Sequence, residues 1–113
     1  MAYPKLLEVA SILLQKSQAG EINWERTANE NTFQTSLSRY SILINKMVGH
    51  EGNEHYSLKI FNEEGREIEE LTGYAARTEG GLHLSEVFEL ARRTAMGVEK
   101  ALDEVLVALR KAS

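Results

Sequence analysis

The spacing of apolar residues along the chain follows a helical period first, then a strand period, and then a helical period again. Between Pro4 and Ala19 the apolar residues recur every three or four positions, which is typical of one face of an amphipathic helix. Proline suits the first turn of a helix, and Gly20 follows at the point where a left-handed residue commonly ends one. The pattern therefore predicts a helix over about residues 4–19.

Four segments in the middle of the chain alternate apolar and polar residues, as half-buried strands do. These segments are Thr32–Leu37, Tyr40–Met47, His55–Phe61 and Arg66–Thr72. Because the links between them are short, we expect hairpins and an antiparallel meander, with Gly65 supplying the positive φ of the last loop. Ahead of the strands, alternation at Ile22 and Trp24 predicts a short extended piece inside a polar connector.

The last third of the chain carries the clearest repeat, two series of apolar residues that recur every seven positions. The first series is Leu84, Ala91, Val98 and Val105, and the second is Phe88, Ala95, Leu102 and Leu109. This pattern is typical of a coiled-coil seam and also of a long helix that lies across a sheet. We favour the helix across the sheet, from about Leu84 to Lys111 with Ser85 as its N-cap. Gly97, in its interior, indicates a kink or a close backbone approach.

The predicted final helix is longer than the sheet it would cover. A helix of about 28 residues is about 42 Å long, whereas a six-residue strand spans about 20 Å. We therefore expect the seam to be buried against the sheet or a partner helix. Helix one, a kink at Gly97 or a second copy of the chain would cover the part that overhangs the sheet. The residues expected to be buried are Phe88, Ala91, Ala95, Val98, Leu102, Val105 and Leu109.

The order of elements predicts an α+β fold. It is a two-layer sandwich of a helix, an antiparallel meander of three to four strands and a long C-terminal helix, with the helices on one face of the sheet. A length of 113 residues fits a single domain over residues 1–113.

Composition removes several classes of function. The chain has no cysteine, so thiolate chemistry and disulfides are excluded. The net charge of −4 disfavours a dedicated nucleic-acid binder, which needs clustered lysine and arginine. No apolar run approaches the about 20 residues of a membrane span, and no signal peptide is visible. We expect a cytoplasmic protein without a nucleic-acid or membrane partner.

Three polar clusters in the sequence contain residue types that could carry chemistry. The segment His50–His55 contains two imidazoles and two carboxylates, but its spacing and its glycine favour a solvated loop over a metal site. Glutamates at 63, 64, 67, 69 and 70 form an acidic hairpin, whose alternation favours a solvated strand face over acid–base catalysis. Gly80-Gly81 lacks the pattern of a phosphate-binding loop. We expect no catalytic residue, no metal and no cofactor.

Two motifs carry a resemblance that spans most of the chain. They are Ile22-Asn23-Trp24-Glu25, followed by Thr27, Phe33 and Leu37, and then Tyr56-x-Leu58-x-Ile60-x-Asn62-Glu63-x-Gly65. In these motifs the chain resembles a group of small uncharacterised bacterial proteins, and this resemblance implies no activity, ligand or site residue. By architecture and acidity alone it is also similar to small secretion chaperones, which dimerise and hold a client protein. That second likeness has no matching motif, and fold does not fix function.

Two functions of different classes remain open. The first is a non-enzymatic protein-interaction module, chaperone-, regulator- or immunity-like, that acts as a homodimer. Its predicted interaction residues are Ile12, Met96, Val105, Val107 and Leu109. The alternative is a small-ligand binder or enzyme with a pocket between sheet and helices. The residues that would line that pocket are Trp24, Tyr40, Tyr56 and Tyr74.

Overall fold

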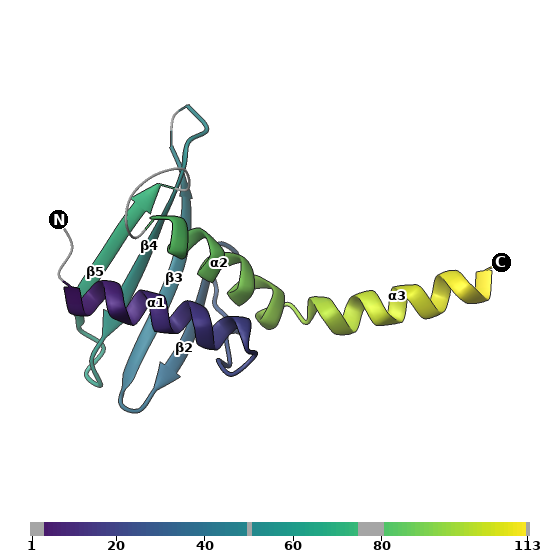
Figure 1. The fold of residues 1–113 in the computed structure, drawn as a ribbon, viewed down its shortest axis with the longest axis horizontal. Coiled ribbons are helices and arrows are strands. Elements are labelled where there is room, and N and C mark those ends of the chain that lie inside the picture. The colour runs from purple at the N-terminus through teal and green to yellow at the C-terminus, as the bar shows by residue number, and fades with distance from the viewer. Residues whose placement is uncertain (1–3, 50, 75–80, 113) are drawn as a thin grey trace.

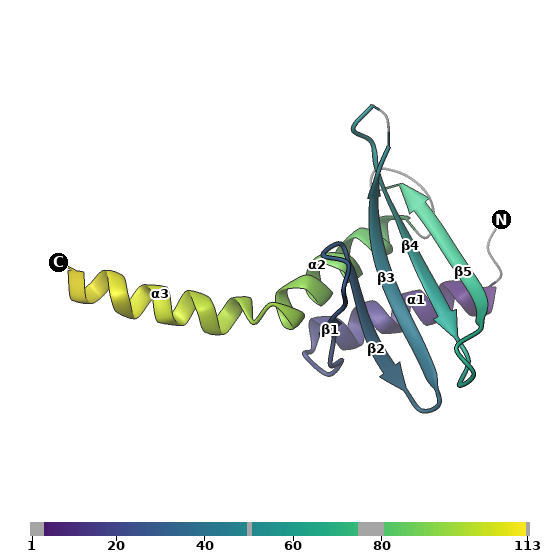
Figure 2. The same ribbon diagram turned by 180° about the vertical axis from the view of Figure 1, so that it is seen from behind.

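The computed structural model describes residues 4–49, 51–74 and 81–112. The helices are α1 (Pro4–Gln18), α2 (Gly81–Ala95) and α3 (Val98–Ala112), and the strands are β1 (Glu25–Arg26), β2 (Thr32–Leu37), β3 (Tyr40–Val48), β4 (Glu54–Phe61) and β5 (Glu67–Tyr74). The strands form one antiparallel sheet in the order β1-β2-β3-β4-β5. Helices α1 and α2 lie side by side on one face of the sheet, and α3 projects away from both layers (Figures 1 and 2). The predicted α+β order of helix, meander and C-terminal helix is confirmed, with one strand more than expected.

Short hairpins set the register of the meander. Ser38 takes a positive φ of 59° in the two-residue link between β2 and β3. In the link between β4 and β5, Gly65 has a φ of 81°, as predicted for this turn. The Asn62 side-chain oxygen accepts hydrogen bonds from the backbone N–H groups of Glu64 and Arg66, both at 3.0 Å. This Asn-centred turn reverses the chain and allows β5 to pair with β4.

The additional strand, β1, is held in place by a buried tryptophan beside it. Trp24 is 2% exposed, and its indole Nε1–H donates to Ser17 Oγ of α1 at 3.0 Å. That bond satisfies the indole away from water and fixes the connector against the helix. The chain then pairs Glu25 with Gln34 and Arg26 with Phe33 in antiparallel register. The fifth, two-residue strand therefore follows directly after the residues for which the alternation predicts an extended piece, Ile22 and Trp24.

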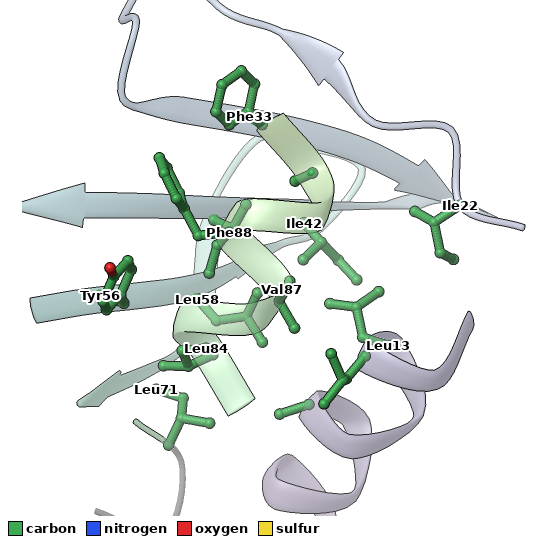
Figure 3. Close-up of a cluster of buried hydrophobic side chains, with 14 of the residues drawn as sticks. Leu13, Ile22, Phe33, Ile42, Tyr56, Leu58, Leu71, Leu84, Val87 and Phe88 are labelled. Carbon is green, nitrogen blue, oxygen red and sulfur yellow. The ribbon is translucent and has the colours of Figure 1, made fainter. Parts of the chain in front are cut away.

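The core lies between the sheet and the two helices. Alternate residues of β2, β3, β4 and β5 point toward α1 and α2, and the apolar faces of the helices meet them (Figure 3). The central members, all at 0% exposure, are Ala10, Ile44, Leu58, Leu84, Val87 and Ala91. Phe88 lies between two strand aromatics, with ring centroids 5.5 Å from Phe33 and 5.7 Å from Tyr56. This shared core holds the two helices and the sheet together as one folded unit.

The other face of the sheet is not covered by any element that the structure describes (Figure 2). The register puts Leu43, Asn45 and Met47 of β3 on that face, where all three are half-buried. Thr32 Oγ1 donates to Asn45 Oδ1 at 2.8 Å across the β2–β3 pair. Antiparallel sheets commonly leave one face to solvent, so this mixture of polar and apolar residues is an ordinary outcome.

The single long C-terminal helix predicted from the heptad pattern is wrong, because the helix is interrupted at Gly97. This residue has a φ of 63°, and its N–H donates to the Thr94 carbonyl at 3.2 Å while the Met96 N–H donates to the Arg92 carbonyl at 2.9 Å. A left-handed glycine with such backward bonds ends a helix. A new helix starts at once, with the Ala101 N–H donating to the Gly97 carbonyl at 3.0 Å.

The interruption changes which seam residues are buried. Phe88 and Ala91 of α2 are buried, as predicted, and Ala95 and Val98 are half-buried. Beyond the turn, Leu102, Val105 and Leu109 are exposed, so the chain's own sheet does not bury them, and their burial against a partner helix stays a prediction. The physical reason is the direction of the chain. The turn at Gly97 directs α3 away from the sheet, so the seam residues of α3 do not contact the sheet (Figure 1).

We expect Gly97→Ala to lower the free energy of unfolding by about 1 kcal/mol. A left-handed φ costs an L-residue roughly 1–2 kcal/mol, and glycine alone avoids that cost. No heavy atom lies within 4 Å of the position that the new Cβ would take, so the effect is conformational and not a clash. Urea unfolding measures it, with Thr94→Ala, an exposed α2 position, as the control within about 0.5 kcal/mol of the parent. Equal stability of the two variants would contradict the left-handed turn.

Candidate functional site

The most prominent surface of the molecule is the apolar side of α3. None of the 15 residues of this helix is buried. Its large apolar side chains are nevertheless close together in sequence at helical spacing. They are Leu102 at 48% exposure, Val105 at 51%, Leu106 at 45% and Leu109 at 62%. With about 100° between successive residues, these four fall within one arc of the helix, which we call the α3 stripe. An exposed, contiguous apolar stripe is the usual mark of a contact surface.

The charged residues of α3 are divided by sign along the helix. Glu99, Asp103 and Glu104 lie in the first half of the helix, and Arg110 and Lys111 lie in its last turn. Glu99 also pairs with Arg93 of α2, with Arg93 Nη2 2.5 Å from Glu99 Oε2 across the Gly97 turn. The helix is thus acidic toward the body of the molecule and basic toward its far end.

The five predicted interaction residues are all exposed but do not form one surface. Val105 and Leu109 lie together on the α3 stripe, whereas Val107 is about 200° of helical rotation from Val105 and lies among the charged residues. Met96 precedes the Gly97 turn and borders a hollow of about 250 Å³ beside the β1–β2 link, most of whose lining residues are polar. Ile12 is on α1, a helix that lies on the sheet, whereas α3 projects away from the sheet (Figure 1). An interaction role for any of them stays a prediction.

Ile12 borders a second apolar surface that the sequence did not indicate. A groove of about 470 Å³ runs between α1 and the ends of β2 and β3. Its lining is mainly apolar, with an ion pair of 3.1 Å between Lys16 and Glu21 at its edge. The lining residues are Val9, Ile12, Leu13, Lys16, Glu21, Ile22, Leu37 and Ile42. The groove lies at the rim of the sandwich rather than between its layers.

A cluster of charges lies where β3 and β4 meet α2. Lys46 Nζ is 2.9 Å from Glu54 Oε2 and 5.8 Å from the centroid of the Phe88 ring. The Tyr56 hydroxyl donates to Glu54 Oε1 at 3.4 Å, which is a long hydrogen bond. On α2, Arg92 Nε donates to Glu89 Oε1 at 3.1 Å, the pairing within the helix that the three-residue spacing predicts.

The electrostatics of this cluster favour a structural role over proton transfer. The hydrogen bond and charge of Glu54 raise the pKa of Lys46, and Lys46 in turn lowers the pKa of Glu54. Burial and the neighbouring Glu54 raise the pKa of Tyr56, and Arg92 lowers the pKa of Glu89. Every shift holds its group further from titration at neutral pH, whereas a general acid or base needs a pKa near the working pH. The cluster therefore ties the end of the sheet to α2.

The sequence alone does not identify Lys46 as a residue of this cluster, although the alternation along β3 indicates its position. Ile42, Ile44 and Lys46 are two residues apart along β3, so the alternation places all three on the face that meets the helices. A lysine in such a register is expected to carry its aliphatic stem along the core and to place its charge at the rim. The contact with the Phe88 ring agrees with that expectation.

The other sequence candidates separate into described and undescribed residues. The glutamates of the acidic hairpin are exposed, with Glu67 3.7 Å from Lys59. His50 and Gly80 lie outside the described residues, as do the side chains of Tyr74 and His83. Of the aromatic residues expected to line a pocket, Trp24 and Tyr56 are in the core, and Tyr40 is 42% exposed. Among the described residues no three His, Asp or Glu side chains group closely enough to hold a metal ion.

Within the same described part of the chain, no helix has the length and apolar character that crossing a membrane requires. Comparisons of the chain with protein-family models, with curated proteins and with solved structures find no match. The surfaces and contacts described above are therefore the basis for a functional assignment.

Proposed function

We propose that the protein is a non-enzymatic protein-interaction module that acts as a homodimer, and that the α3 stripe is its contact surface. The observation that carries the proposal is that α3 has no buried residue while its large apolar side chains are roughly half exposed. Isolated helices of about 12–15 residues are marginal in water, because most helix stability in proteins comes from packing an apolar face. A second protein surface on the stripe supplies that packing.

A second copy of the chain is the partner that the sequence of α3 favours. The stripe continues the heptad pattern, in which helices of the same sequence pack against one another. Two-fold interfaces that use the same patch on both subunits are the commonest kind. Since α3 contains little more than two heptads, we expect weak association, with a dissociation constant of roughly 10–100 µM.

The alternative of a small-ligand site has less support. The groove at α1 has a volume in the range of ligand pockets, about 300–1,000 Å³. It has few convergent polar groups, however, and the aromatic residues expected to line a pocket between the layers are used in the core or lie apart from the groove. The groove is therefore kept as a second contact surface and not as a reaction site.

The test is the solution mass measured by sedimentation equilibrium between about 5 and 500 µM, a range that brackets the expected dissociation constant. We expect the intact chain to approach twice its 12.7 kDa mass as concentration rises. The double variant Val105→Glu, Leu109→Glu should remain a monomer, because burying an unpaired carboxylate opposes association.

A matched control separates the stripe from the rest of the helix. Val107→Glu makes the same valine-to-glutamate change as at Val105. Its position is similarly exposed, 48% against 51%, but lies on the opposite side of α3. If the stripe alone is the contact, Val107→Glu should associate like the intact chain, and loss of association would add Val107 to the interface. An intact chain that stays monomeric over the whole range would refute the proposal.

A further inference from the structure

The direction in which two α3 helices pair is constrained by their charges. The first half of α3 carries three acidic side chains, Glu99, Asp103 and Glu104, and one basic one, Lys100. The last turn carries Arg110 and Lys111 and no acidic side chain. A parallel pair places acidic half against acidic half and basic turn against basic turn. An antiparallel pair instead places the first turn of each copy, with Glu99, near the basic last turn of the other copy, so attraction replaces repulsion at both ends.

The shape of the molecule favours the same direction. The body formed by the sheet, α1 and α2 is attached at the start of α3 (Figures 1 and 2). The axes of packed helices are 8–10 Å apart, whereas the two shorter dimensions of the molecule are 37 and 26 Å. A parallel pair would bring both bodies to the same end, where they would crowd each other. In an antiparallel pair the bodies lie at opposite ends of a helix about 22 Å long.

The heptad positions also define a register for the antiparallel pair. In antiparallel coiled coils the two seam series face each other, so that a residue of one series opposes a residue of the other. Aligning the seam of α3 with its own reversed copy places Val98 opposite the partner's Leu109 and Leu102 opposite the partner's Val105. Each contact occurs twice by symmetry, which gives four apolar layers within α3.

We infer that α3 is a self-complementary antiparallel dimerisation helix, with Val98 facing the partner's Leu109 and with Glu99 in the first turn of each copy near the basic last turn of the other. This inference rests on the proposed function. It adds the direction of the helix pair, its register and the charge complementarity of its ends. The same register puts Glu99 near the height of the partner's Arg110, on the matching flank of the stripe.

Cysteine cross-linking tests the direction, because the chain has no cysteine of its own. Two single variants, Val98→Cys and Leu109→Cys, are mixed in a glutathione redox buffer at a concentration at which the chain associates. Disulfides need Cα atoms about 4.4–6.8 Å apart, so only opposed positions react efficiently. We expect the disulfide between the two different variants to predominate in the mixture and each variant alone to give little dimer. Predominant 98–98 and 109–109 disulfides would overturn the antiparallel direction.

Charge reversal provides an independent readout. In an antiparallel pair, the double variant Arg110→Glu, Lys111→Glu replaces attraction by repulsion at both ends. We expect this variant to weaken association by roughly tenfold at low salt. Adding Glu99→Lys to the same chain places a lysine near the two new glutamates of the partner and should restore most of the loss. In a parallel pair the first change replaces one like-charge contact by another, so unchanged affinity would overturn the inference.

The outcomes separate this inference from the proposed function. An intact chain that never associates refutes both. A chain that dimerises, yet forms no disulfide through either position and is insensitive to charge reversal, remains a homodimer that uses another surface, and the inference about α3 fails alone. The uncovered sheet face and the groove at α1 are the surfaces to which such a result would point.

Discussion

Leu84→Ala is expected to lower the free energy of unfolding by about 2–5 kcal/mol, whereas Leu102→Ala is expected to lower it by less than about 0.5 kcal/mol in the monomer. Both leucines belong to the heptad pattern of the C-terminal third, and both changes remove the same atoms. Their surroundings differ: Leu84 has no exposed surface in the core between sheet and helices, and Leu102 is 48% exposed on α3. Truncation in a packed core leaves a cavity, and truncation on an exposed helix does not.

Urea unfolding at about 1 µM, below the expected dissociation constant, measures both costs in the monomer. Repeating the titration at concentrations above that constant adds a second comparison. Because partner binding stabilises the folded state by mass action, the cost of Leu102→Ala should then rise, and the cost of Leu84→Ala should not. A cost above about 2 kcal/mol for Leu102→Ala at the low concentration would mean that α3 packs against its own body.

The sheet was predictable from the sequence because its signals are local. Alternation along residues 32–37, 40–47 and 55–61 reflects burial of one strand face, and the short links leave antiparallel pairing as the simplest connection. Gly65 adopts the expected positive φ. The two-residue strand β1 is different, since its existence depends on Trp24 reaching Ser17 of α1. That is a tertiary contact, which alternation alone does not encode.

In the C-terminal third the heptad pattern is real, but the single helix predicted from it is wrong. Apolar residues recur every seven positions on both sides of Gly97, so the pattern reads as one helix. The break depends on a single residue in a left-handed conformation, which changes the direction of the chain without disturbing the periodicity. The seam is therefore divided into a buried part on α2 and an exposed part on α3, and the exposed part is the proposed contact surface.

The candidate site was predictable only in part, because exposure is a property of the assembled fold. Helical geometry alone separates Val105 and Leu109 from Val107. It does not show that the stripe is left without a partner in the chain, since that follows from the direction of α3. The sequence indicates Ile12 because this residue lies off the apolar face of its helix. The groove beside it forms only where α1 lies next to β2 and β3.

Phe88→Ala is expected to have the largest single effect on stability, a loss of about 3–5 kcal/mol in the free energy of unfolding. The side chain is 5% exposed and joins α2 to the sheet, with its ring packed against Phe33 of β2 and Tyr56 of β4 (Figure 3). Truncation removes both aromatic contacts and the ring beneath the Lys46 ammonium, and it leaves a cavity between rigid strands.

Two further variants, measured in the same urea titration, provide reference values for the loss caused by Phe88→Ala. Phe88→Leu keeps most of the apolar volume and should lose about 1.5 kcal/mol or less, so it remains measurable if Phe88→Ala is too unstable to fold. Phe61→Ala makes the same truncation at a half-buried position near the end of β4, where less surface is removed from water, and should cost clearly less than Phe88→Ala. Equal losses at the two phenylalanines would show that α2 is not seated on the sheet through Phe88.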